Sequence, residues 1–207
     1  VGSVGGLNYL VLGFVNGIAC GFSIPISWTF GAKDYKEMRR YTANTVWLSA
    51  AFAVVLTVVT VALTRSVLVW TNTPANIIDI ADIYIRTIFW GIPFTLLYNV
   101  TSALMRALGD SKATLYFLLV SSVLNVVLDL VFVAGLGMGV AGAAIATVIS
   151  QFLCVPWLLS FLHGKRAIIR LKPKYIRFAP AIVKRILALG VSNFTMGVTE
   201  SAVSIVN

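Results

Sequence analysis

Asn125-Val126-Val127-Leu128-Asp129 lies inside an apolar run that extends from about Ala113 to Val133. The run has the roughly 20 residues that a helix needs to cross a bilayer. A carboxylate held in such a segment is costly and usually marks an ion or proton pathway. Asn125 and Asp129 are four residues apart, so both project from one face of a helix. We interpret this face as the coupling-cation site of a secondary transporter.

The composition predicts a polytopic membrane protein. Of the 207 residues, 59% are hydrophobic and 11% are charged, whereas a soluble domain has about 25% charged residues. The mean hydropathy is +0.93. In a soluble protein the net charge of +9 would suggest nucleic acid as a partner. Here the basic residues lie in loops, so we attribute the charge to membrane topology and expect no nucleic-acid partner.

Six apolar spans are long enough to be membrane helices. They are about Leu7–Phe30, Thr42–Leu63, Tyr84–Leu104, Ala113–Val133, Met138–Leu162 and Leu187 to the end. Fourteen of the 16 lysines and arginines fall in loops on one side of these spans, and only Arg65 and Arg86 fall on the other. By the positive-inside rule the basic side is cytoplasmic. We therefore expect a multi-pass protein of the inner (plasma) membrane.

Small residues and prolines indicate how the spans pack and bend. The first span has glycine at every fourth position, at Gly13, Gly17 and Gly21, a pattern that lets another helix approach closely. Pro25 in the first span and Gly91-Ile-Pro93 in the third predict kinks or broken helices. In transporters such points often border the cavity.

The chain divides into three parts. Residues 1–163 form a lobe of five spans, residues 164–186 form a basic linker and residues 187–207 begin a further span. Within the linker, Lys172 to Arg185 has apolar residues at helical spacing with basic residues opposite them, which predicts a helix on the cytoplasmic surface of the membrane. A plain solvated linker is the alternative. Because the chain begins and ends inside apolar stretches, we expect a fragment.

No enzyme signature or cofactor site is predicted. Gly137-Met-Gly139-Val-Ala-Gly142 fits the pattern of a dinucleotide-binding turn, but a membrane-length run precedes it instead of a short strand. We interpret it as a tight turn between two spans. The single histidine, His163, lies at a span end. We expect no enzyme, and no cofactor other than a coupling ion, Na⁺ or H⁺.

The fourth and fifth spans carry polar residues at matching depth. Counted from the outer ends of these antiparallel spans, Asn125 lies about 12 Å deep and Thr147 about 13 Å. Gln151 lies one turn further in than Thr147, and Asp129 lies nearer the outer surface. Carboxylate, amide and hydroxyl oxygens suit Na⁺, and the carboxylate can instead carry a proton. The alternative is that Asn125 and Thr147 only hydrogen-bond each other or a neighbouring helix.

Further polar residues are candidates for a substrate cavity. Glu200 is a second acid inside an apolar span, where ionisable residues are usually functional. Thr95, Asn99 and Ser102 of the third span, together with Gln151 of the fifth, are expected to line the same cavity.

Several segments resemble the multidrug and toxic compound extrusion (MATE) family. They are Pro25-Ile-Ser-Trp-Thr-Phe-Gly-Ala-Lys-Asp34, Ala103-Leu-Met-Arg-Ala-Leu-Gly-Asp-Ser-Lys112, Asn125-Val-Val-Leu-Asp129 and Gly137-Met-Gly-Val-Ala-Gly-Ala-Ala-Ile-Ala-Thr147. Together with the order of the spans and the loop charge, the resemblance covers nearly the whole chain.

The resemblance implies a twelve-helix antiporter of two six-helix lobes. The expected fold is an all-α polytopic membrane helix bundle that holds helices two to six and the start of helix seven. In the family, a cation site in the first lobe uses an Asp on helix one, an Asn and an Asp on helix five and a Thr on helix six. Asn125, Asp129 and Thr147 match the last three, and Glu200 looks like a helix-seven acid of one family branch.

The expected function is export of amphiphilic, often cationic, small molecules in exchange for Na⁺ or H⁺. The full-length protein is expected to be a monomer in contact with membrane lipid. Two alternatives stay open. One is a flippase for lipid-linked precursors from the same superfamily, which would be expected to carry more cationic residues in its cavity. The other is a non-transporting membrane subunit, whose polar residues only pack helices.

Overall fold

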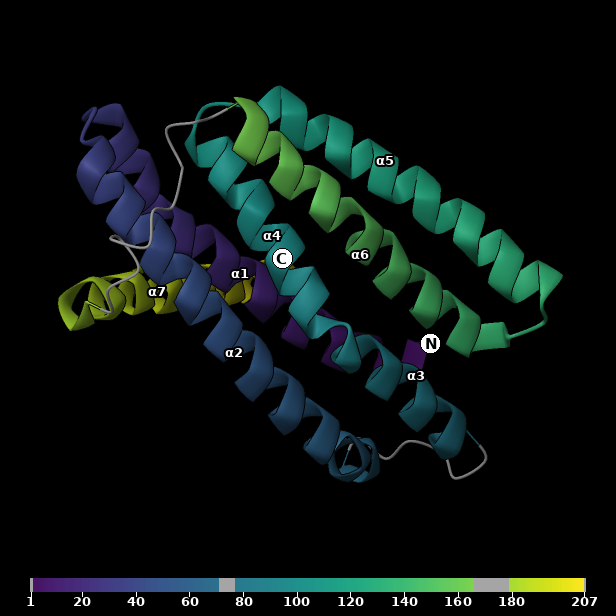
Figure 1. Cartoon of the computed structure of the whole chain (residues 1–207). Helices are drawn as coiled ribbons and strands as arrows, with labels where there is room; N and C mark the ends of the chain where they lie inside the picture. Colours follow the sequence, from purple (N-terminus) through teal and green to yellow (C-terminus); the bar gives the residue numbers. More distant parts are fainter. Residues whose placement is uncertain (1, 71–76, 166–178, 207) are drawn as a thin grey trace.

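The computed structural model describes the backbone of residues 2–70, 77–165 and 179–206, and the side chains of 11–70, 77–156, 160, 179–192 and 195. Its regular structure is helical throughout these ranges (Figure 1). In chain order the helices are α1 (Gly2–Gly31), α2 (Tyr35–Trp70), α3 (Ile78–Trp90), α4 (Ile92–Ala107), α5 (Ser111–Asp129), the π-helix η1 (Leu130–Gly135), α6 (Gly139–Lys165) and α7 (Pro180–Val206).

The helices confirm the expected membrane bundle. Within the described residues, four helical segments are long and apolar enough to cross a membrane, in α1, α2, α5 with η1, and α6. The pair α3 and α4 makes a fifth when it is counted as one bent span. The sixth predicted span forms the later part of α7, where most side chains after Ser192 lie outside the described residues.

The loops with basic residues share one end of the bundle. Figure 1 shows the turn between α1 and α2, the turn between α4 and α5, and the end of α6 in its upper part, opposite the end of α2 and the beginning of α3. This arrangement agrees with the alternation on which the predicted topology rests. Of the predicted basic linker, 164–186, residues 166–178 lie outside the described residues, and the last part, from Pro180 onward, forms the beginning of α7.

Two aspartates begin helices at this end. The Asp34 Oδ1 accepts a hydrogen bond from the Glu37 amide at 3.0 Å, and the Asp110 Oδ1 accepts one from the Ala113 amide at 3.2 Å. Such side-chain acceptors satisfy amides that have no partner inside the helix. Gly109 stands before the second aspartate with a φ of 79°, which glycine adopts without strain. These caps explain why the chain turns sharply between the long helices.

The third predicted span is broken, as Gly91 and Pro93 indicate. Helices α3 and α4 meet at Gly91 with a bend of 43°. Proline has no amide hydrogen to donate to the preceding turn, so Pro93 sits in the first turn of the new helix. At Pro25 the helix is not broken, because α1 runs through this residue from Gly2 to Gly31, and a kink there stays a prediction.

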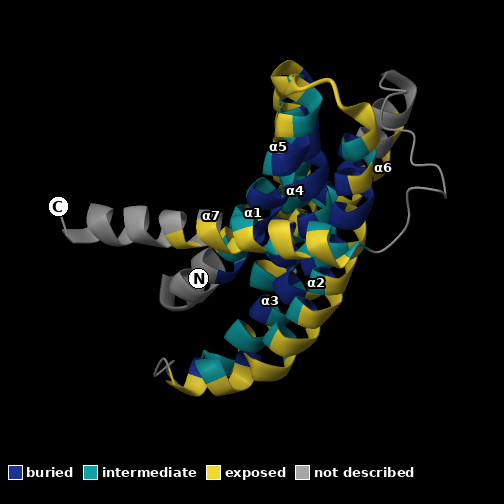
Figure 2. Ribbon diagram, turned by 90° about the vertical axis from the view of Figure 1, so that its left-hand side faces the viewer, coloured by how far each residue is buried: buried dark blue, intermediate teal, exposed yellow. Residues whose placement is uncertain are grey.

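The interior of the bundle is partly polar and its surface is largely apolar. On α2 the exposed side chains include Val54, Val55 and Val58. The buried polar side chains of the same helix are Thr42, Asn44, Thr45, Ser49, Thr57 and Thr64. Figure 2 shows exposed faces along the lengths of the outer helices. This distribution suits lipid outside and a polar interior, because lipid cannot hydrogen-bond the polar groups.

Candidate functional site

The predicted proximity of Asn125 and Thr147 is confirmed. The Asn125 Nδ2 on α5 donates to the Thr147 Oγ1 on α6 at 3.3 Å. The Thr147 hydroxyl in turn donates to the Ala143 carbonyl of its own helix at 3.0 Å. The threonine oxygen is therefore oriented toward the amide by a backbone acceptor. An amide and a hydroxyl from two antiparallel helices meet where the depth comparison places them.

Asp129 ends α5 one helical turn from Asn125 and is half-buried. Its Oδ1 is shielded from solvent and has no hydrogen-bond partner among the described residues. Buried polar atoms in proteins nearly always have a partner. A carboxylate oxygen without a protein donor is what a site for a cation or proton requires. The side chains near this end of α5 thus provide carboxylate, amide and hydroxyl oxygens, which are hard ligands.

A π-helix follows Asp129 directly, and the sequence did not predict it. In η1 the hydrogen bonds widen, and the Leu136 amide reaches the Val131 carbonyl five residues back at 2.9 Å. Gly142 of α6 packs closely on this turn, because a Cβ at Gly142 would lie 3.1 Å from the Cβ of Phe132. Single π turns often occur at functional sites. Here the π turn fixes where the chain leaves the helix beyond the carboxylate.

Gln151 is held by a partner that the sequence did not identify. Its Oε1 on α6 accepts a short hydrogen bond from the Thr95 hydroxyl on α4. The rings of Phe94 and Phe152 meet edge to face beside this pair, with centroids 5.0 Å apart. Gln151 is therefore tied to the broken span, next to its bend.

The other cavity candidates divide into described and undescribed residues. Asn99 on α4 is half-buried, while Ser102 on the same helix is fully buried. The Ser102 hydroxyl interacts with the Tyr98 side chain of the same helix. The side chain of Glu200 lies outside the described residues, and its role stays a prediction.

Comparison with known proteins places this geometry in a family. The family model MatE matches residues 1–131. The chain is 31% identical over 192 residues to the probable multidrug resistance protein YoeA of Bacillus subtilis (strain 168), and the match covers 89% of this chain and 42% of that protein. It is 23% identical over 197 residues to the multidrug export protein MepA of Staphylococcus saprophyticus, and this match covers 95% of this chain and 44% of MepA.

The fold also matches solved structures. A crystal structure of MATE in the bent conformation superposes with a TM-score of 0.90 and 23% identity, over 99% of this chain and 46% of that one. The chain thus spans less than half the length of the relatives it matches. The family model covers more than half of the chain, and the helices agree with it. This multi-pass membrane chain belongs to the MatE family.

Proposed function

We propose that the full-length protein is a secondary multidrug exporter of the plasma membrane. It exports amphiphilic, often cationic, compounds in exchange for inward Na⁺ or H⁺, and it works as a monomer by alternating access. The names of YoeA and MepA, a multidrug resistance protein and a multidrug export protein, support this class of substrate. Because this chain spans less than half the length of these relatives, transport must be measured with the full-length protein.

The observation that carries the proposal is the unpaired carboxylate oxygen of Asp129. It lies one turn from the hydrogen-bonded pair of Asn125 and Thr147. Binding of Na⁺ or a proton supplies the partner that this oxygen lacks. A cation shifts the lobe toward one conformation only to the extent that this conformation binds the cation more tightly than the other conformation does. Cation binding at Asp129 thereby favours the conformation from which drug has been released.

The test is cation-driven efflux of a fluorescent cationic dye from proteoliposomes that contain the full-length protein. The variant is Asp129→Asn, and the matched control is Asp79→Asn, because Asp79 is an exposed carboxylate at the start of α3. We expect Asp129→Asn to lower the rate of efflux driven by an inward Na⁺ or proton gradient about tenfold or more. A tenfold change corresponds to about 1.4 kcal/mol of differential cation binding. Asp79→Asn should retain its efflux. Unchanged cation-driven efflux in Asp129→Asn would refute the role of this residue.

The two rival functions give different results in the same preparation. A flippase would move a lipid-linked precursor, and not the dye, across the bilayer. For a non-transporting subunit, Asp129→Leu would leave a folded and functional complex, because the carboxylate would serve packing alone.

A further inference from the structure

One face of α6 reaches two different helices. Thr147 and Gln151 are one turn apart, so they project from the same side of α6. Thr147 accepts from Asn125 on α5, whereas Gln151 accepts from Thr95 on α4. Two consecutive turns of α6 therefore join the candidate cation site to the broken span through side-chain hydrogen bonds.

The contact with the broken span is centred on its bend. A Cβ at Gly91 would overlap the Cγ2 of Val148, so α6 packs directly on the backbone of the bend. The Phe94–Phe152 ring contact lies about one turn after Gly91 on α4 and about one turn after Val148 on α6. On α6, Val148 directly follows Thr147 and Phe152 directly follows Gln151 in the sequence. A shift of α6 at Thr147 must therefore move the surface on which the bend rests.

The bend itself can absorb such a shift. The Gly91 amide is shared between the Ile88 carbonyl three residues back, at 2.9 Å, and the Thr87 carbonyl four residues back, at 3.3 Å, so the helix tightens here toward a 3₁₀ turn. Pro93 has no amide hydrogen to hold the next turn. Hinges are commonly a few element-terminal residues where the backbone can change its dihedral angles at small energetic cost. The bend of 43° between α3 and α4 has this construction.

We propose that Gln151 and Thr95 are positioning residues that transmit occupancy of the Asp129 site to the bend between α3 and α4. A cation that draws in Asn125 and Thr147 moves this turn of α6, and Gln151 carries the movement to Thr95 at the start of α4. The inference rests on the proposed function and deepens it, because it names two residues whose mutual hydrogen bond sets how well cation binding changes the shape of the lobe.

The experiment follows the bend in the full-length protein by electron–electron distance measurements between two spin labels. The labels are attached to cysteines that replace Ile80 on α3 and Tyr116 on α5, which are 58% and 69% exposed. The native cysteines are removed, here by Cys20→Ala and Cys154→Ala. Sodium chloride is titrated at fixed pH in one arm, and the pH is stepped at fixed salt in the other. The cation concentration at which half of the distance change has occurred reports the affinity of the site. The fraction of molecules that change their distance at saturating cation reports how well binding is transmitted to the bend.

Four variants separate transmission from packing. Thr95→Val and Gln151→Leu remove the bond, and Thr95→Ser keeps the hydroxyl. Thr101→Val is the control, because among the described residues the Thr101 hydroxyl donates to the Leu97 carbonyl of its own helix, at 2.7 Å, and to no other helix. Hydrogen bonds between membrane helices contribute about 0.6 kcal/mol on average, so we expect Thr95→Val and Gln151→Leu to lower the ratio of switched to unswitched molecules about threefold. The half-change point should stay within about twofold of the wild-type value.

Thr95→Ser and Thr101→Val should switch like the wild type, and Asp129→Asn should not switch at all. The inference is overturned if Thr95→Val switches as fully as Thr101→Val. It is also overturned if Thr95→Val shifts the half-change point while all molecules still switch, because Thr95 would then belong to the cation site. If Asp129→Asn switches normally, the proposed function fails as well, so the two failures are distinguishable.

Discussion

Gly21 of α1 and Gly190 of α7 lie backbone to backbone, so close that a Cβ at Gly21 would overlap the Cα of Gly190. The ring of Phe22 lies against Gly190 as well. Helix α7 packs across α1 here (Figure 2). The glycine pattern predicted close approach for the whole stripe, but a Cβ at Gly13 would meet nothing within 4 Å. Close packing is confirmed at Gly21, whereas Gly13 makes no such contact.

Gly21→Leu should separate α1 from α7, whereas Gly13→Leu should not. Overpacking of a tight contact typically destabilises by about 1–3 kcal/mol, and here the neighbouring atoms are backbone that cannot rotate away. The measurement is thermal unfolding of the full-length protein in detergent. Equal melting temperatures for the two variants would contradict the contact.

The sequence predicted what depends on position along the helix axes. Apolar length located the spans, Gly91 and Pro93 located the bend, and depth along two antiparallel helices placed Asn125 beside Thr147. Contacts that depend on the rotation of two helices about their axes were not predictable. Thr95 and Gln151 meet because of such a rotation, and so do Gly21 and Gly190. The π turn after Asp129 packs against Gly142 of α6, a contact that no local pattern of residues signals.

The span lengths were also underestimated, for a physical reason. The second span was predicted as Thr42–Leu63, but α2 runs from Tyr35 to Trp70. Apolar length reports only the part of a helix that lies in hydrocarbon. Outside that layer a helix can continue through charged residues such as Arg40 and Arg65, because water solvates them.

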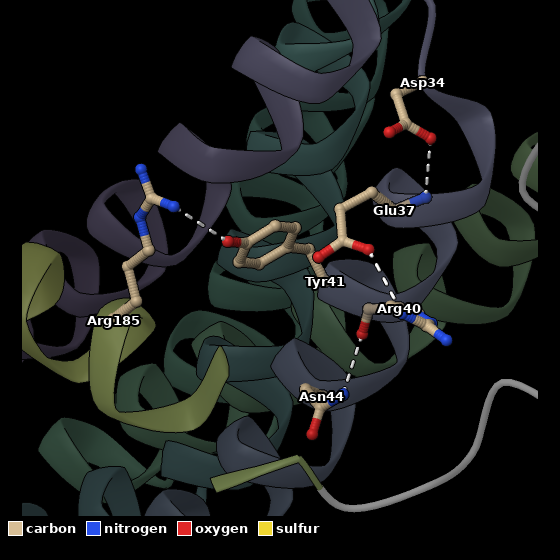
Figure 3. A network of polar contacts seen from close by, with 6 residues as sticks. All are labelled: Asp34, Glu37, Arg40, Tyr41, Asn44 and Arg185. Atoms are coloured by element: carbon tan, nitrogen blue, oxygen red, sulfur yellow. Dashed lines mark hydrogen bonds and ion pairs between the residues drawn. The ribbon is translucent and has the colours of Figure 1, made fainter. Parts of the chain in front are cut away.

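A polar network holds the beginning of α7 against α2 (Figure 3). The Asn44 Oδ1 accepts from the Ala179 amide at 3.1 Å, while its Nδ2 donates to the Arg40 carbonyl at 2.9 Å. The Arg185 guanidinium donates to the Tyr41 hydroxyl at 3.4 Å and lies 5.9 Å from the ring centroid of Trp28. The amide at the start of α7 thus depends on a buried side chain of another helix.

Asn44→Leu should loosen the start of α7. The variant leaves the Ala179 amide without its acceptor, which is a loss of about 1–3 kcal/mol for a buried donor. Hydrogen exchange of the peptide that contains Ala179 should accelerate. Tyr41→Phe should have a smaller effect, because it keeps the ring and removes one hydrogen bond of about 1 kcal/mol. Thr60→Val is the control, since within the part of the chain that the structure describes its hydroxyl donates to carbonyls of its own helix. Exchange as slow as in this control would show that Asn44 does not hold the helix.

Two ion pairs that involve aspartates of α3 should differ in how much they contribute to stability. Asp79 is 77% exposed and lies 3.3 Å from Arg65, whereas Asp82 is 13% exposed and lies 2.8 Å from Arg86. Exposed pairs contribute about 0–1 kcal/mol and are screened by salt. Asp82→Asn should therefore lower the unfolding temperature of the full-length protein more than Asp79→Asn does. The effect of Asp79→Asn should also disappear in high salt. The reverse order would mean that burial does not govern these pairs.

The packing of Val148 on Gly91 can be tested by exchanging a methyl group between them. Gly91→Ala places a Cβ where the Cγ2 of Val148 now lies, and valine cannot easily rotate away in a helix because it is branched at Cβ. The expected destabilisation is about 1–3 kcal/mol. Val148→Ala removes the overlapping methyl group, so the double variant should be more stable than Gly91→Ala alone. Residues in contact show such non-additivity, of about 0.5–3 kcal/mol, whereas distant residues do not. Additive effects on thermal unfolding would show that α6 does not rest on the bend.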